Sequence, residues 1–170
     1  DKEKKLLVLI DYNKVNTTIT IDQLFTSIKS AMKASLNETD SFNIIVSSFD
    51  YSPVQEGWIA GSDDNIDAAF ASETVNNIAN YSLLPNLINV AISTVEADPT
   101  ASVVLFSASC NERDYLQANQ LLSDLDSRMQ RKITFYIAYY ANKDVPNANG
   151  PNGQKYLGDE YFLSTLAKLS

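Results

Sequence analysis

The sequence KLLVLID, at residues 5–11, decides the class of fold. Its apolar residues follow one another without a break from Leu6 to Ile10. A short, continuous apolar run of this kind is typical of a strand that is buried on both faces of a parallel sheet. Asp11 ends the run. We therefore expect a central parallel strand with a carboxylate at its carboxyl end.

The residues that follow this strand have the pattern of an amphipathic helix. Thr20 and Gln23 have the spacing of a capping box, in which each side chain binds the backbone N–H of the other residue. Apolar residues then recur at every fourth position, at Leu24, Ile28, Met32 and Leu36. The pattern predicts a helix that begins after Thr20 and packs one face against the strand.

Strand-like and helix-like segments alternate along the rest of the chain. Strands are predicted at residues 42–49, 102–107 and 132–140, and residues 54–60 have the pattern of a short antiparallel edge strand. Helices are predicted from Ser62 or Asp63 to Ile78, at 84–97, from Asn111 or Glu112 to Met129, and at 159–170. Residues 142–154 contain Pro and Gly and are expected to form an exposed loop with little regular structure.

This alternation defines one fold class. Strands separated by helices form βαβ units, which give a mostly parallel sheet with helices on both faces. The 170 residues are about the length of one domain, and they contain no internal repeat. The sequence predicts a single domain over residues 1–170. Its fold class is α/β, three-layer and doubly wound, with one short antiparallel edge strand and a Rossmann-like arrangement.

The charge of the chain excludes some classes of partner. There are 13 Lys and Arg residues against 21 Asp and Glu residues, which gives a net charge of -8. A domain this acidic repels phosphate backbones and anionic membrane surfaces. No apolar run approaches the roughly 20 residues that cross a bilayer, and residues 1–20 lack the pattern of a signal peptide. We expect neither nucleic-acid binding nor membrane insertion.

The composition also argues against an enzyme. Histidine is absent, so no imidazole base, Ser-His-Asp triad or Cys-His pair is possible. No Gly-rich phosphate loop exists among the five glycines. The single cysteine, Cys110, precedes a predicted helix, whose N-terminus could lower the pKa of the thiol. A buried or unreactive thiol is the simpler interpretation, and a small enzyme that uses Cys110 stays as an alternative.

Ligands of doubly wound folds bind beyond the carboxyl ends of the strands. The loops to inspect therefore follow Ile10, Ser107 and Tyr140, together with the start of the helix at Leu84. Tyr136, Tyr139 and Tyr140 could form a recognition surface, although the preference of aromatic residues for strands also explains them.

Two segments carry a resemblance to a known family. DSFNIIVSSFDYSPVQEGWIAGSDDNIDAAF, at residues 40–70, is similar to the von Willebrand factor A family, especially its inter-alpha-trypsin-inhibitor-like branch. EYFLSTLAKLS, at residues 160–170, resembles the last helix of that family. The resemblance covers nearly the whole chain by pattern more than by any invariant motif. It implies a von Willebrand factor A-like domain, excised from a longer protein.

The family's metal-ion-dependent adhesion site is only partly matched. Its Asp-x-Ser-x-Ser string falls on Asp11, Asn13 and Val15, and a valine side chain offers no ligand. The family's Thr falls on Pro85 and its second Asp falls on Ala108. The resemblance therefore implies a degenerate site with Asp11 and Asn13 as vestigial ligands, for which Ser107, Ser109 or Asn86 could substitute. No cofactor is expected, with Mg²⁺ or Ca²⁺ as the alternative.

The expected function is a non-catalytic adhesion or protein-interaction module that works without a metal, through loops near Asp11, Asn86 and Ser109. The runner-up is an adhesion module that binds Mg²⁺, Mn²⁺ or Ca²⁺ through substituted ligands. The resemblance also implies a protein partner and an extracellular or cell-envelope location.

Overall fold

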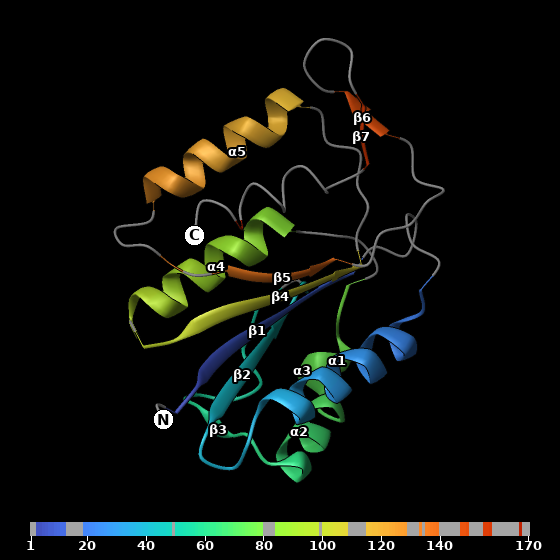
Figure 1. Ribbon diagram of the computed structural model, residues 1–170, viewed down its shortest axis with the longest axis vertical. Helices are drawn as coiled ribbons and strands as arrows, with labels where there is room; N and C mark the ends of the chain where they lie inside the picture. Colours follow the sequence, from blue (N-terminus) through green and yellow to red (C-terminus); the bar gives the residue numbers. More distant parts are fainter. Residues whose placement is uncertain are drawn as a thin grey trace.

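The computed structural model describes residues 3–12, 19–48, 50–79, 84–98, 100–108, 115–128, 133, 135–139, 147–149, 155–157 and 167. Five strands form its main sheet, in the order β3-β2-β1-β4-β5 (Figure 1). They are β1 (Lys5–Tyr12), β2 (Ser41–Val46), β3 (Ile59–Ala60), β4 (Ser102–Ala108) and β5 (Phe135–Tyr139). All neighbouring strands are parallel except β3, which is antiparallel to β2. The predicted fold class is confirmed, with β1 in the centre.

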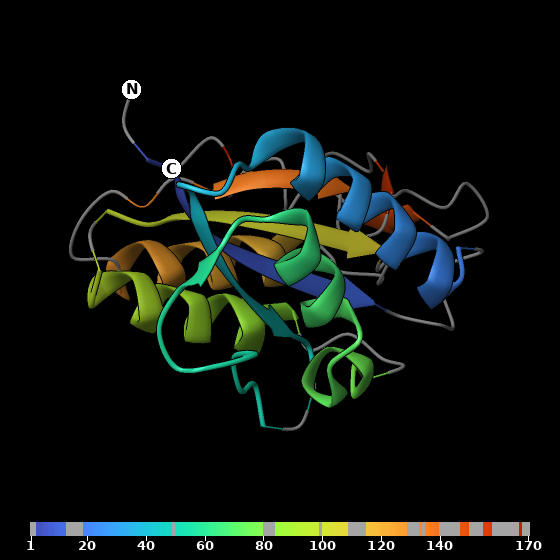
Figure 2. The same ribbon diagram turned by 90° about the horizontal axis from the view of Figure 1, so that it is seen from below.

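Helices cover both faces of this sheet. On one side lie α1 (Ile21–Ser35), α2 (Asp63–Phe70) and α3 (Glu73–Asn76), and on the other lie α4 (Leu84–Glu96) and α5 (Tyr115–Arg128) (Figure 2). The capping box of α1 forms as predicted, because Gln23 N donates to Thr20 Oγ1 at 3.1 Å and Thr20 N donates to Gln23 Oε1 at 2.9 Å. Among the described helices, none is both long enough and apolar enough to cross a membrane.

The side chains of β1 alternate between two cores. Leu7 and Leu9 point into the core under α4 and α5, whereas Val8 and Ile10 point into the core under α1, α2 and α3. All four are at most 1% exposed. An uninterrupted apolar strand is needed here because successive side chains of a strand point to opposite faces.

The single helix predicted from Ser62 or Asp63 to Ile78 is wrong, because α2 ends at Phe70 and α3 starts afresh at Glu73. Ser72 lies between them and caps α3, where its Oγ accepts from Val75 N at 3.3 Å. The same hydroxyl donates to Ala69 O at 2.6 Å. A serine that binds nearby backbone groups competes with continued helix, and here it interrupts it.

The edge strand predicted at residues 54–60 is shorter than expected, since only Ile59–Ala60 pair with β2. The buried Asn43 of β2 explains the loss, because its Nδ2 donates to Gln55 O at 2.8 Å and to Gly57 O at 2.9 Å. These two carbonyl groups accept hydrogen bonds from a side chain and not from the backbone of a neighbouring strand. Gly57, with φ of 79°, adopts the left-handed conformation that glycine accepts most readily.

The expectation of little regular structure over residues 142–154 is also wrong in part. Strands β6 (Asn147–Asn149) and β7 (Lys155–Leu157) form a separate antiparallel pair, with Asn147 opposite Leu157. The helix predicted at 159–170 lies outside the described residues, apart from Ala167, which is helical.

Candidate functional site

The carboxyl ends of β1 and β4 bring a carboxylate and a hydroxyl together. Asp11 and Ser107 are direct partners in the register of the two strands. Ser107 Oγ donates to Asp11 Oδ2 at 2.9 Å, and both residues are 0% exposed. This hydrogen bond lies at the edge of the sheet where doubly wound folds bind ligands.

Two buried serines, directly after the end of β2, extend this polar region. Ser47 N donates to Ile10 O at 2.9 Å, and Ser47 O accepts from Ala79 N at 2.7 Å. Ser48, next in the chain, donates its Oγ to Asp50 Oδ1 at 3.2 Å. We call Asp11, Ser47, Ser48 and Ser107 the polar strip. The strip holds four of the six buried polar or charged residues of the described part of the chain, the others being Asp40 and Asn43. Buried polarity is therefore concentrated at this edge.

The structure brings together only some of the residues of the predicted site. It joins Asp11 to Ser107, whereas Asn86 is exposed in the first turn of α4. Asn13, Val15, Ser109 and Cys110 lie outside the described residues. The sequence interpretation missed Ser47 and Ser48. Their signal was available, because both follow directly after the apolar run of a strand parallel to β1.

The described residues do not fit a tightly held divalent cation. Mg²⁺ and Ca²⁺ require several hard oxygen ligands, and the described residues contain no cluster of three Asp, Glu, Cys or His side chains suited to a metal. Pro85 lies within α4, and Ala108 is buried opposite Tyr12, so neither side chain offers an oxygen. Asp11 is the carboxylate of the polar strip, and the Ser107 hydroxyl already binds it.

Of the tyrosines of β5, Tyr139 pairs in register with Ser107 of the polar strip, whereas Tyr136 lies apart from the strip. Tyr136 is 57% exposed and pairs in register with Val104, near the amino-terminal half of β4, while its neighbour Phe135 is buried. This alternation is what a strand at the edge of a sheet produces. The Tyr139 side chain and Tyr140 lie outside the described residues, so a shared tyrosine surface stays a prediction.

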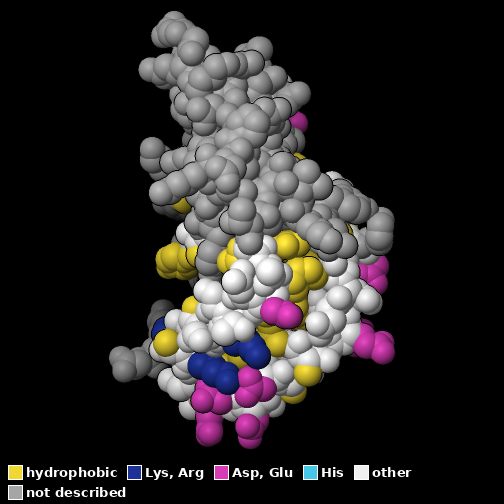
Figure 3. All heavy atoms as spheres, turned by 90° about the vertical axis from the view of Figure 1, so that its right-hand side faces the viewer, with side chains coloured by type: hydrophobic (Ala, Val, Ile, Leu, Met, Phe, Trp, Pro, Cys, Tyr) yellow, Lys and Arg dark blue, Asp and Glu magenta, His cyan; other side chains and the backbone are white. Residues whose placement is uncertain are grey.

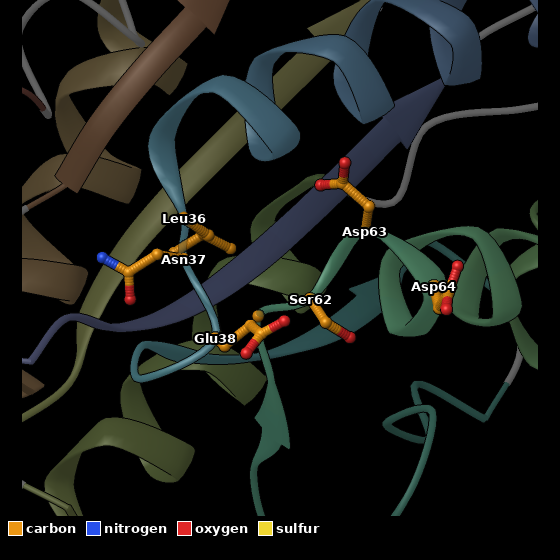
Figure 4. Close-up of a pocket in the computed structure, with 7 residues that line it drawn as sticks. Leu36, Asn37, Glu38, Ser62, Asp63 and Asp64 are labelled. Carbon is orange, nitrogen blue, oxygen red and sulfur yellow. The ribbon is translucent and has the colours of Figure 1, made fainter.

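A hollow of about 340 Å³ lies between the end of α1 and the start of α2, far from the polar strip along the strands (Figure 4). Glu38, Asp63 and Asp64 line it, and Ser62 Oγ accepts from Asn65 N at 3.2 Å as the cap of α2. Figure 3 shows basic side chains beside acidic ones at this end of the molecule. Lys33 Nζ lies 2.8 Å from Asp67 Oδ1 here. Helix capping and surface charge account for these residues.

Comparison with known proteins adds evidence on the fold. No family model and no curated protein matches the sequence. The structure is similar to the conserved hypothetical protein BatB from Bacteroides thetaiotaomicron, with a TM-score of 0.59 and 12% identity over 99% of this chain and 86% of that one. It is similar to an aerotolerance-related membrane protein from Bacteroides fragilis, with a TM-score of 0.61 and 13% identity over 99% and 88%. It is also similar to the SpRpn10 VWA domain, with a TM-score of 0.54 and 12% identity over 99% and 82%.

These likenesses cover nearly the whole chain at low identity, so they define its fold. The parallel sheet with β1 at its centre, the antiparallel β3 and the helices on both faces agree with them. The protein has the von Willebrand factor A fold, as the resemblance of its sequence predicted. A shared fold does not by itself carry a shared activity.

Proposed function

We propose that this chain is a non-catalytic protein-interaction or adhesion module that recognises its partner without a metal ion. The observation that carries the proposal is the buried hydrogen bond from Ser107 Oγ to Asp11 Oδ2, at the edge where this fold class binds ligands. A protein hydroxyl there donates to the Asp11 carboxylate, and a buried carboxylate needs such donors in place of water. The likeness to a VWA domain supports an interaction module as the general class.

The same geometry argues against catalysis by the described polar residues. A nucleophile and its base must both reach a substrate. Ser107 and Asp11 are hydrogen-bonded but are 0% exposed, so no substrate contacts them without a rearrangement of the edge. The chain contains no histidine that could serve as a base elsewhere. We therefore assign the polar strip a structural role at the edge proposed for recognition.

The location of the protein and the class of its partner are proposed from two further observations. One similar structure is described as a membrane protein of Bacteroides fragilis. The net charge of -8 disfavours nucleic acid and anionic lipid as partners. We propose an extracellular or cell-envelope setting and a protein partner.

The test compares thermal unfolding in EDTA with unfolding in millimolar Mg²⁺, Mn²⁺ and Ca²⁺. An ion at about 100 times its dissociation constant stabilises the folded state by about 2.7 kcal/mol. In a domain of this size that raises the midpoint by roughly 5 to 10 °C. We expect no shift with any ion. A shift of that size in the wild type, lost in Asp11→Asn, would establish a working metal-dependent adhesion site instead.

A separate measurement addresses the alternative enzyme. A catalytic Cys110 requires a thiolate at neutral pH, so its reaction with a thiol reagent would be far faster than that of a small-molecule thiol. We expect an ordinary or slow rate. A fast rate that falls on acidification would favour an enzyme that uses Cys110.

A further inference from the structure

A path of hydrogen bonds, linked through the covalent backbone between Ile10 and Asp11, crosses the carboxyl edge of the sheet. It begins at Ser107 of β4, whose Oγ donates to Asp11 Oδ2 of β1 at 2.9 Å. From the adjacent Ile10, the carbonyl oxygen accepts from Ser47 N at 2.9 Å, and Ser47 O accepts from Ala79 N at 2.7 Å. The path therefore joins β4, β1, the end of β2 and the segment that follows α3. These parts are far apart in sequence, with Asp11 and Ser107 separated by 96 positions.

The pair at the edge differs from the pairs beside it. From Leu7 to Ile10, every residue of β1 is opposite an apolar residue of β4, such as Val104 opposite Val8 and Leu105 opposite Leu9. A buried carboxylate costs free energy that an aliphatic pair would not cost, so stability alone does not favour it. A hydrogen bond differs from an apolar contact in being directional. The Asp11 and Ser107 pair can thus fix the relative position of two strand ends, which a pair of leucines would fix less sharply.

We infer that Asp11 and Ser107 are positioning residues, which hold the carboxyl ends of β1, β2 and β4 in one arrangement without a cation. The inference rests on the proposed function, because it matters for recognition only if partners bind at this edge. The hydroxyl of Ser107 does part of what a bound metal would do, since it satisfies the buried Asp11 carboxylate from the neighbouring strand. The edge is then ordered before any partner binds, which lowers the entropic cost of binding.

The test measures amide hydrogen exchange by NMR in EDTA. Two reporters are the amides of Ser47 and Ala79, which donate along the path, and the amide of Gly61 is the reference, since it donates to Asp40 O at 2.8 Å at the opposite edge. Ser107→Ala should speed exchange at Ser47 and Ala79 by roughly tenfold or more, the factor that the loss of a hydrogen bond to a charged group implies. Gly61 should be unchanged.

Two further variants separate positioning from general stability. Ser102→Ala is the matched control, because Ser102 lies at the other end of β4, opposite Leu6. It should leave all three amides as in the wild type. Asp11→Asn keeps an oxygen that accepts from the Ser107 hydroxyl, so it should preserve slow exchange at Ser47 and Ala79.

The outcomes are distinguishable. Unchanged exchange at Ser47 and Ala79 in Ser107→Ala would overturn the inference, as would equal acceleration at Gly61, which indicates global destabilisation. Rapid edge exchange in Asp11→Asn would also overturn it, because charge and not the hydrogen bond would then hold the edge. Slower edge exchange on adding Mg²⁺ to the wild type would instead contradict the proposed metal-free function.

Discussion

At the amino-terminal edge of the sheet, the Asp98 carboxylate binds Lys5 Nζ at 2.8 Å, whereas at the carboxyl-terminal edge the Asp11 carboxylate is buried against the Ser107 hydroxyl. Lys5 and then Thr100 donate to Asp98 and lower its pKa to about 2. The Asp98 side chain is 25% exposed, while Asp11 is 0% exposed. One edge thus pairs charges in contact with water, and the other holds a carboxylate away from water with a neutral donor.

A second carboxylate strengthens the first edge. Asp40 accepts from Lys4 N at 2.7 Å and from Asn37 N at 3.0 Å, and these backbone groups hold its pKa below the usual value. Lys5 Nζ also lies 5.4 Å from the centroid of the Trp58 ring. The carboxylates of Asp40 and Asp98 each accept hydrogen bonds from more than one donor, which suits a purely structural role. Asp40 is itself buried, so the two edges differ in their donors: a lysine side chain and backbone amides at one, and the neutral Ser107 hydroxyl at the other.

The largest expected effect comes from the buried pair. Asp11→Ala and Ser107→Ala should each lower the free energy of unfolding by about 2 kcal/mol or more, since each removes a buried hydrogen bond to a charged group. The double variant should reveal a coupling energy of about 1.5 to 3 kcal/mol in a urea unfolding cycle. Additive losses would show that the two residues do not interact energetically.

Acid should weaken the amino-terminal edge next. Asp40 and Asp98 have a lower pKa in the folded protein than the ordinary value of 3.8. Their stabilisation is therefore present above that value and is lost as the pH falls through the folded pKa, which for Asp98 is about 2. Asp98 alone should account for on the order of 1 kcal/mol, discounted for solvent screening. Urea unfolding at pH 5, 4, 3 and 2.5 measures the loss, and Asp98→Asn should show a shallower decline.

A smaller effect is expected at neutral pH from the ion pair between Lys5 and Asp98. Lys5→Met keeps an apolar side chain of similar length but removes the charge, so stability should fall by about 0.5 to 1 kcal/mol. High salt should reduce the difference between the wild type and the variant, because salt screens exposed charges. A difference that persists unchanged in 1 M salt (roughly a 3 Å screening length) would mean that packing against Trp58 is responsible.

The smallest effect is expected at Lys33 and Asp67, which join α1 to α2 with 33% and 52% of their side chains exposed. Lys33→Met should leave the thermal midpoint unchanged within error, since exposed pairs contribute little. A clear loss would show that the contact between the two helices depends on this pair.

Local signals in the sequence predicted the parts of the fold that local interactions determine. The uninterrupted run at β1 and the capping box at Thr20 need no knowledge of distant residues. The break at Ser72 could not be predicted, because serine is compatible with a helix interior as well as with a cap. The lost strand before Ile59 depends on Asn43, which binds backbone atoms 12 and 14 positions away.

The candidate site was predictable to a similar extent. Asp11 stood out because it ends an apolar run, and Ser107 was considered as a substitute ligand at the end of another strand. Their direct hydrogen bond follows from the register of β1 and β4, which the sequence does not specify. Ser47 joins the strip through its backbone and through its Oγ, which donates to Ile10 O at 3.4 Å, and its place directly after the apolar run of β2 was the available signal.

The division of β1 between two cores has a consequence for how this sequence can diverge. Exchange of one aliphatic residue for another at Leu7, Val8, Leu9 or Ile10 keeps each side chain in its own core. Insertion or deletion of one residue would move every later side chain of the strand to the opposite face. It would also carry Asp11 out of register with Ser107. Natural variants of this protein should therefore differ in the aliphatic residues of β1 but not in the length of the strand.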